Sequence, residues 1–228
     1  MIVPIALISV FVAWFVSQNP FLFRRKVDTT GFDIVTQQEA LDSQLNLPSV
    51  RSALGQDFDR YRNHCLRVFN FATYFMPNSV MEEMPHALDI LGVALAYHDV
   101  ALWTDGALNY LDPSVQQMES HLSQASDALL IKEELDIAGI IIQEHHKVTS
   151  YAAGKNATVN ALVNAARKAD WADFTLGVIG WGIPAGLIQA AYEQLPELGF
   201  HIVLAKMGKR LSPDSLVGQL AVLKIFKW

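Results

Sequence analysis

The residues best suited to chemistry are His98 and Asp99, which lie side by side in the apolar run Val93–Trp103. The nearest other charged residues along the chain are Asp89 and Asp105. Burying an imidazole or a carboxylate is costly unless the group has a partner. Two explanations follow: the pair caps the end of a helix and satisfies itself locally, or both side chains bind a common cation.

Other side chains that can bind metals recur on the apolar faces of predicted helices, three or four residues from hydrophobic ones. With His98, they are His64, His121, His145 and Asp170. A single buried histidine is usually only hydrogen-bonded, but that explanation does not account for the whole set. Several polar groups in one core require a shared counter-charge, which a divalent metal supplies. Imidazole and carboxylate ligands suit zinc, iron or manganese.

The elements that must position these side chains are helices, because apolar residues repeat at three and four and few convincing stretches repeat at two. The predicted helices run from Gln56 to Pro77, Met84 to Leu102, Asp112 to Leu129, Glu133 to His146, Thr158 to Phe174, Ala185 to Leu195 and Ser215 to Phe226. We therefore predict an all-α fold, with a helical bundle over residues 56–228 and a connector with some helix over residues 27–55.

Composition excludes several classes of function. The chain has 228 residues, enough for one large domain, and it carries 23 acidic against 17 basic residues. It has no basic stripe, so long nucleic acids are poor candidates as ligands. The single cysteine, Cys65, excludes an intramolecular disulfide and a multi-cysteine zinc site. The sequence also lacks a phosphate-binding G-x-x-x-x-G-K-[ST] loop, a G-x-S-x-G elbow and an H-E-x-x-H helix.

The N-terminal residues 1–26 form a separate hydrophobic segment. Residues 2–23 carry no charge and are followed by Arg24, Arg25 and Lys26. About twenty apolar residues can span a bilayer, so a helix here is a candidate membrane anchor. The basic cluster would keep the remaining domain in the cytoplasm, and the missing basic n-region argues against a cleaved signal peptide. The alternative is a helix buried against the domain or a partner in a soluble cytoplasmic protein.

The order His64, His98-Asp99, Asp170 resembles the H, HD, D pattern of the HD-domain superfamily of metal-dependent hydrolases, chiefly phosphohydrolases. The resemblance covers roughly residues 57–174. It implies an HD-domain helical bundle in which these four residues hold the first metal ion. It also implies that Asp99 can bridge to a second ion or to the attacking water.

Some HD subfamilies add two histidines between the HD pair and the last aspartate. His121 and His145 fall in this interval on separate predicted helices, and Ile141–His145 matches the I-x-x-x-H element of those subfamilies. The resemblance therefore implies one or two divalent ions, with His121 and His145 as further ligands. His146 is turned about 100° from His145 on a helix, which predicts a supporting or exposed position.

Residues for substrate binding are less clearly indicated. Many HD proteins follow the HD pair with glycine and lysine, whereas Val100 and Ala101 follow it here. Candidates for neutralising an anionic substrate are Arg62, Lys147, and Arg167 or Lys168. Asp173, three residues after Asp170, is a candidate for orienting a ligand histidine or the nucleophilic water.

By this resemblance, the predicted activity is hydrolysis of a small phosphorylated substrate, such as a nucleotide, by a metal-activated water. The ordered set H, HD, H, H, D also resembles diiron oxygenases of the same superfamily, and other relatives hydrate small nitriles. A non-catalytic, membrane-tethered module with a structural metal is the third alternative.

Overall fold

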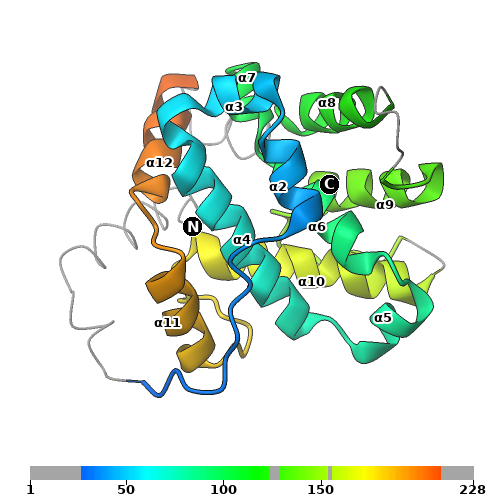
Figure 1. Cartoon of the computed structure of the whole chain (residues 1–228), viewed down its shortest axis with the longest axis vertical. Helices are drawn as coiled ribbons and strands as arrows, with labels where there is room; N and C mark the ends of the chain where they lie inside the picture. Colours follow the sequence, from blue (N-terminus) through cyan, green and yellow to red (C-terminus); the bar gives the residue numbers. More distant parts are fainter. Residues whose placement is uncertain (1–26, 124–128, 154–155, 212–228) are drawn as a thin grey trace, which may run out of the picture.

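The computed structural model describes residues 27–123, 129–153 and 156–211. Across these ranges the chain is all-α and contains no β-strand, which confirms the predicted fold class (Figure 1). The predicted N-terminal helix in residues 1–26 and the predicted helix at residues 215–226 lie outside the described residues.

The helices in chain order are α2 (Glu39–Leu45), α3 (Pro48–Leu54), the 3-10 turn η1 (Gly55–Asp57), α4 (Phe58–Phe75), α5 (Asn78–Glu83), α6 (Ala87–Tyr97), α7 (Ala101–Thr104), α8 (Leu111–Ser123), α9 (Lys132–Glu144), α10 (Ala157–Phe174), α11 (Ala185–Gln194) and α12 (Phe200–Leu211). Helices α4, α6, α8, α9, α10 and α11 confirm predicted ones, with ends shifted by a few residues. The short α5 and the amphipathic α12 were not predicted.

The predicted helix from Met84 to Leu102 is interrupted at the HD pair. Helix α6 ends at Tyr97, and His98 is its C-cap residue. The turn that follows is closed by hydrogen bonds from the Val100 amide to the Tyr97 carbonyl (3.1 Å) and from the Leu102 amide to the Asp99 carbonyl (3.0 Å). His98 and Asp99 therefore lie just past the end of α6, where both side chains can point toward the same place in the core.

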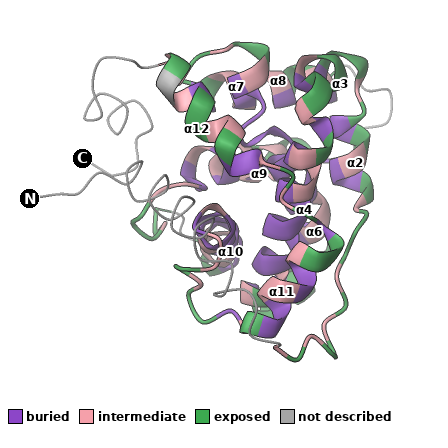
Figure 2. Ribbon diagram, turned by 90° about the vertical axis from the view of Figure 1, so that its left-hand side faces the viewer, coloured by how far each residue is buried: buried purple, intermediate pink, exposed green. Residues whose placement is uncertain are grey.

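One hydrophobic core joins these helices. Helix α4 packs along α10, and α6 packs against α2 and α9. Figure 2 shows α10 as mostly buried. Leu41 and Leu45 of α2 and Leu54 of α3 belong to the same core and are at most 2% exposed. Much of the predicted connector thus packs as part of the bundle.

Within the described part of the chain, one helical stretch, Ala87–Thr104, is apolar and long enough to cross a membrane. It holds the HD pair, and 78% of it is buried inside the structure. That degree of burial is characteristic of a core helix in a folded domain.

Candidate metal centre

His64 is held in a fixed orientation by the carboxylate of Asp173. The His64 Nδ1 atom lies 2.7 Å from Asp173 Oδ2, and both side chains are buried. Arg67 donates to both oxygens of Asp173 (2.6 and 2.9 Å), and Tyr192 donates to its Oδ1 (2.9 Å). The hydrogen of the neutral imidazole is therefore on Nδ1, and the lone pair on Nε2 points away from Asp173.

His98 and His145 share one geometry at two helix ends. Each is the C-cap residue of its helix, α6 or α9. The Nδ1 atoms of these two histidines lie 2.7 Å from the carbonyl oxygens three residues earlier, those of Leu95 and Ile142. Local capping thus uses one nitrogen of each ring and leaves Nε2 available. The two explanations for the HD pair are compatible, because capping orients the ring that a cation would bind.

These Nε2 atoms converge with two carboxylates. His64 Nε2 and His98 Nε2 are 3.0 Å apart, and Asp99 Oδ2 lies 3.4 Å from His98 Nε2. Asp170 Oδ1 lies 3.6 Å from His64 Nε2 and 3.8 Å from His98 Nε2. Ligand atoms about 2.1 Å from one ion, at the angles of tetrahedral or octahedral coordination, stand about 3.0–3.4 Å apart. His64, His98 and Asp99 therefore form a buried group that could hold a metal ion.

The two facing imidazoles need a positive charge between them. Both carry their hydrogen on Nδ1, so two lone pairs face each other across 3.0 Å. Burial lowers the pKa of His98 to about 3, so His98 does not supply the missing proton near neutral pH. A divalent cation satisfies both lone pairs and the adjacent carboxylates.

Asp99 lies between His98 and His145. Its Oδ1 is 3.4 Å from His145 Nε2, while its Oδ2 faces His98. Beyond His145, the Nδ1 of His146 lies 3.2 Å from His145 Nε2 and 3.2 Å from the hydroxyl of Tyr110. Asp99 is thus placed to contact two neighbouring sets of ligand atoms.

Within the buried cluster, which consists of His64, His98, Asp99, His145 and Asp170, the pKa values of Asp99, Asp170 and His145 shift in different directions. Burial works to raise the pKa of Asp99, but His98, His145 and His64 outweigh it and hold that pKa well below its usual range. Burial raises the pKa of Asp170 to about 6, against the lowering effect of His145 and His64. For His145, burial opposes the charged form, yet the hydrogen bond with Asp99 and the charge of Asp170 raise the pKa overall. A protonated His145 would supply positive charge to the cluster, as a bound cation would.

The cluster is most open on its carboxylate side. The side chains of Asp99 and Asp170 are 9% and 10% exposed, whereas the histidine side chains are 0–2% exposed. Tyr61 closes the histidine side, because its ring stacks on His98 at 5.8 Å and its hydroxyl accepts from the Asp99 amide (3.3 Å). The cluster is therefore closest to solvent at its two carboxylates.

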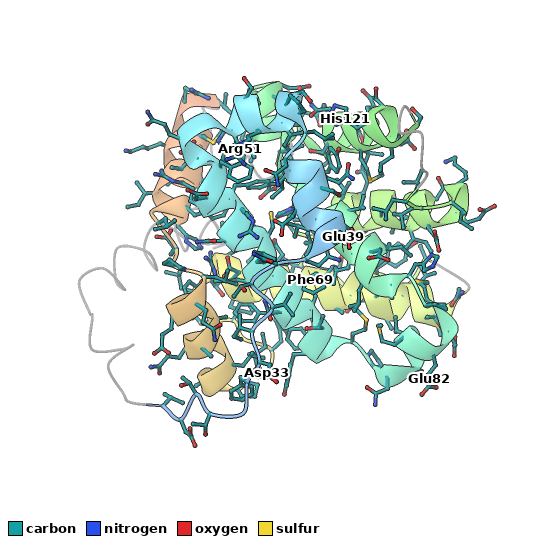
Figure 3. The ribbon with its side chains drawn as sticks, in the orientation of Figure 1. Asp33, Glu39, Arg51, Phe69, Glu82 and His121 are labelled. Carbon is teal, nitrogen blue, oxygen red and sulfur yellow. The ribbon has the colours of Figure 1, made fainter. Side chains whose placement is uncertain are left out.

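His121, predicted as a ligand, lies elsewhere. Its Nδ1 is 2.9 Å from the Tyr97 hydroxyl and its Nε2 is 3.4 Å from Ser49 Oγ. It lines an open cavity of about 350 Å³ with residues of α3, α7 and α8. Figure 3 shows His121 on α8 at the upper edge of the molecule. Helix α8 turns this face toward α3, so His121 does not join the cluster.

The cations predicted for substrate binding are engaged in other interactions. Arg62 donates from Nε and Nη2 to Asp42 (2.5 and 2.9 Å), because a residue two positions before His64 points about 200° away on a helix. Lys147 pairs with Glu144 at 2.6 Å, and Arg167 donates to the carbonyls of Lys147 and Val148. The structure therefore does not bring Arg62 or Lys147 to the ligand atoms as free cations.

Several contributing residues were not predicted. Arg67 and Tyr61 lie three residues after and before His64, so the helical spacing that selected His64 could have identified both. Tyr110 and Tyr192 reach the network through tertiary packing and have no comparable local signal. Asp173 was expected to orient either a histidine or a water, and its contact is with His64.

Comparison with protein-family models, with curated proteins and with solved structures found no match in any of the three. The chemistry of the buried histidine and aspartate cluster is therefore the basis for a functional assignment.

Proposed function

We propose that this chain is a metal-dependent hydrolase of the HD type that acts on a small phosphate ester or anhydride, such as a nucleotide. The observation that supports it is the convergence of three imidazole Nε2 atoms on two carboxylates, each ring being fixed through Nδ1. The ordered pattern H, HD, D, which resembles the HD superfamily, supplies the hydrolytic class.

In this proposal each ligand has a defined task. His64, His98, Asp99 and Asp170 would hold one ion, with the second carboxylate oxygen of Asp99 facing His145. A bound divalent cation lowers the pKa of water and polarises an oxygen of the substrate. Asp173 and the carbonyls of α6 and α9 would keep the imidazoles in the tautomer that binds metal.

The substrate would approach past the carboxylates. Because Arg62, Lys147 and Arg167 have other partners, negative charge on a phosphoryl group would be neutralised chiefly by the ions. His146 and the buried hydroxyl of Tyr110 adjoin the His145 end of the cluster. In this proposal they would donate hydrogen bonds to a small ligand there.

The test is metal analysis of the purified full-length chain, followed by a screen of phosphorylated small molecules under anaerobic conditions. We expect phosphate release that requires Mn²⁺, Fe²⁺ or Zn²⁺ and that is lost in Asp99→Asn. His121→Gln is the matched control, because it removes an imidazole outside the cluster and should retain activity.

Other outcomes would contradict the proposal. Turnover that requires both iron and oxygen would identify an oxygenase instead. If the loaded wild-type protein releases no phosphate and Asp99→Asn loses metal and thermal stability together, the ion is structural.

A further inference from the structure

The loop between α10 and α11 presents apolar side chains to solvent. Val178 is 64% exposed, Trp181 46% and Ile179 36%, all within one short connection. An exposed cluster of large apolar groups in a folded domain often marks a contact surface. The loop follows α10, the helix that carries Asp170.

The shape of the loop is fixed by its own hydrogen bonds. The Gly177 amide donates to the Ala172 carbonyl (2.7 Å), and the Ile179 amide donates to Thr175 Oγ1 (3.0 Å). The Ile183 amide donates to the Gly180 carbonyl (2.8 Å), and Tyr74 donates to the Gly182 carbonyl (3.4 Å). Because these polar groups are satisfied within the structure, the outward apolar side chains are a preformed feature.

The N-terminal end of the described chain lies beside the start of α11, the helix that follows this loop. A Cβ atom at Gly186, the second residue of α11, would lie 2.3 Å from the Asp28 carbonyl and 2.8 Å from the Phe32 ring. In Figure 1 the described chain begins, in dark blue, just below α11. Asp28 therefore lies against the domain where the loop ends and α11 begins.

We propose that Val178, Ile179 and Trp181 insert into the interfacial layer of the lipid bilayer that also holds residues 2–23. Residues 24–27 can span at most about 14 Å, so an anchored segment would keep the start of α11 near the membrane surface. Arg24, Arg25 and Lys26 would meet anionic headgroups, and tryptophan favours the interfacial layer. The domain is then attached at two adjoining points, which fixes its orientation on the membrane.

The experiment places a fluorescent probe at two equally accessible positions in the full chain. Val178→Cys and the control Ile131→Cys, at a residue that is 61% exposed at the start of α9, are each labelled with an NBD fluorophore. Cys65 is buried and should not label in the folded protein. The chains are reconstituted in vesicles of phosphatidylcholine and phosphatidylglycerol, and both variants must match the wild-type melting temperature.

We expect a spin-labelled lipid to quench the probe at residue 178 several-fold more than the probe at residue 131, and aqueous iodide to show the reverse. Equal quenching by iodide at both positions would place the loop in water. If neither quencher reaches residue 178, protein covers the loop, either residues 2–23 or a second copy. A chain that does not float with the vesicles also overturns the proposal.

Discussion

Asp99 and Asp170 face the same imidazole nitrogen, at 4.0 and 3.6 Å from His64 Nε2, yet their pKa values shift in opposite directions. Burial raises the pKa of Asp170 to about 6, whereas the three imidazoles hold that of Asp99 well below its usual range. Asp99 is therefore the permanent anion of the cluster. Asp170 gains or loses its proton at a pH where binding can be measured.

The first prediction concerns pH. The pKa of Asp170 is raised on folding, so its contribution to the free energy of unfolding is present below about pH 4 and lost as the pH rises through about 6. The loss in the metal-free protein is about 2–3 kcal/mol at most. A divalent cation replaces the proton, so the rise in melting temperature on adding Mn²⁺ should grow between pH 5 and pH 7.

The control for this pH effect is Asp170→Asn, which cannot ionise. The metal-free variant should keep its stability between pH 5 and pH 7, apart from changes due to other groups. Stabilisation of the wild-type protein by Mn²⁺ that is the same at pH 5 and pH 7 would show that Asp170 is not a ligand.

The second prediction distinguishes the histidines that bind metal from those that do not. His98→Gln should abolish binding of the first ion, and His145→Gln should lower the amount of bound metal only if a second ion is present. His121→Gln should leave the metal content unchanged, because His121 contacts Tyr97 and Ser49 instead. Metal analysis after dialysis measures all three. Loss of metal in His121→Gln would contradict the geometry.

The third prediction concerns the buried ion pair between Arg67 and Asp173. Asp173→Asn leaves the guanidinium of Arg67 without its counter-charge, and both side chains are fully buried. We expect the free energy of unfolding to fall by about 3 kcal/mol or more, measured by urea denaturation. Adding Arg67→Met should restore part of this loss, because the uncompensated charge is removed.

The matched control for this pair is Lys132→Met, which breaks an exposed ion pair with Asp136. It should leave the free energy of unfolding nearly unchanged, because an exposed ion pair contributes little to stability. If the losses caused by Asp173→Asn and Arg67→Met simply add in the double variant, the pair is not coupled as described.

The fourth prediction tests the contact between α2 and α6. A Cβ at Gly92 would lie 2.3 Å from Gln38 Oε1, the atom that caps α2 by accepting from the Leu41 amide. Gly92→Ala should therefore displace the Gln38 side chain, and the lost cap, about 1 kcal/mol, should offset the gain from alanine in the helix. In a Gln38→Ala background the clash is gone, and the same change should be stabilising because alanine favours a helix. Equal effects in both backgrounds would contradict this packing.

The periodicity of the sequence predicted most of the longer helices, because an apolar face repeats along each one. It also predicted that His64, His98, His121, His145 and Asp170 share one core, which holds for all of them except His121. It did not predict α5, which is too short for a clear period, or α12. The break after Tyr97 was only one of two explanations of the HD pair, since the rest of Val93–Trp103 is apolar and carries no proline or glycine at the turn.

The sequence by itself determined an all-helical chain with imidazoles and carboxylates on apolar helix faces, because helical spacing depends only on residues close together in the chain. The tertiary structure decided which of them meet: it joins His64 to Asp173, which is 109 residues away, and it turns His121 toward Ser49. It also decided that Arg62 pairs with Asp42. The reason is physical: the direction of a side chain follows from its own helix, but its partners depend on how separate helices pack.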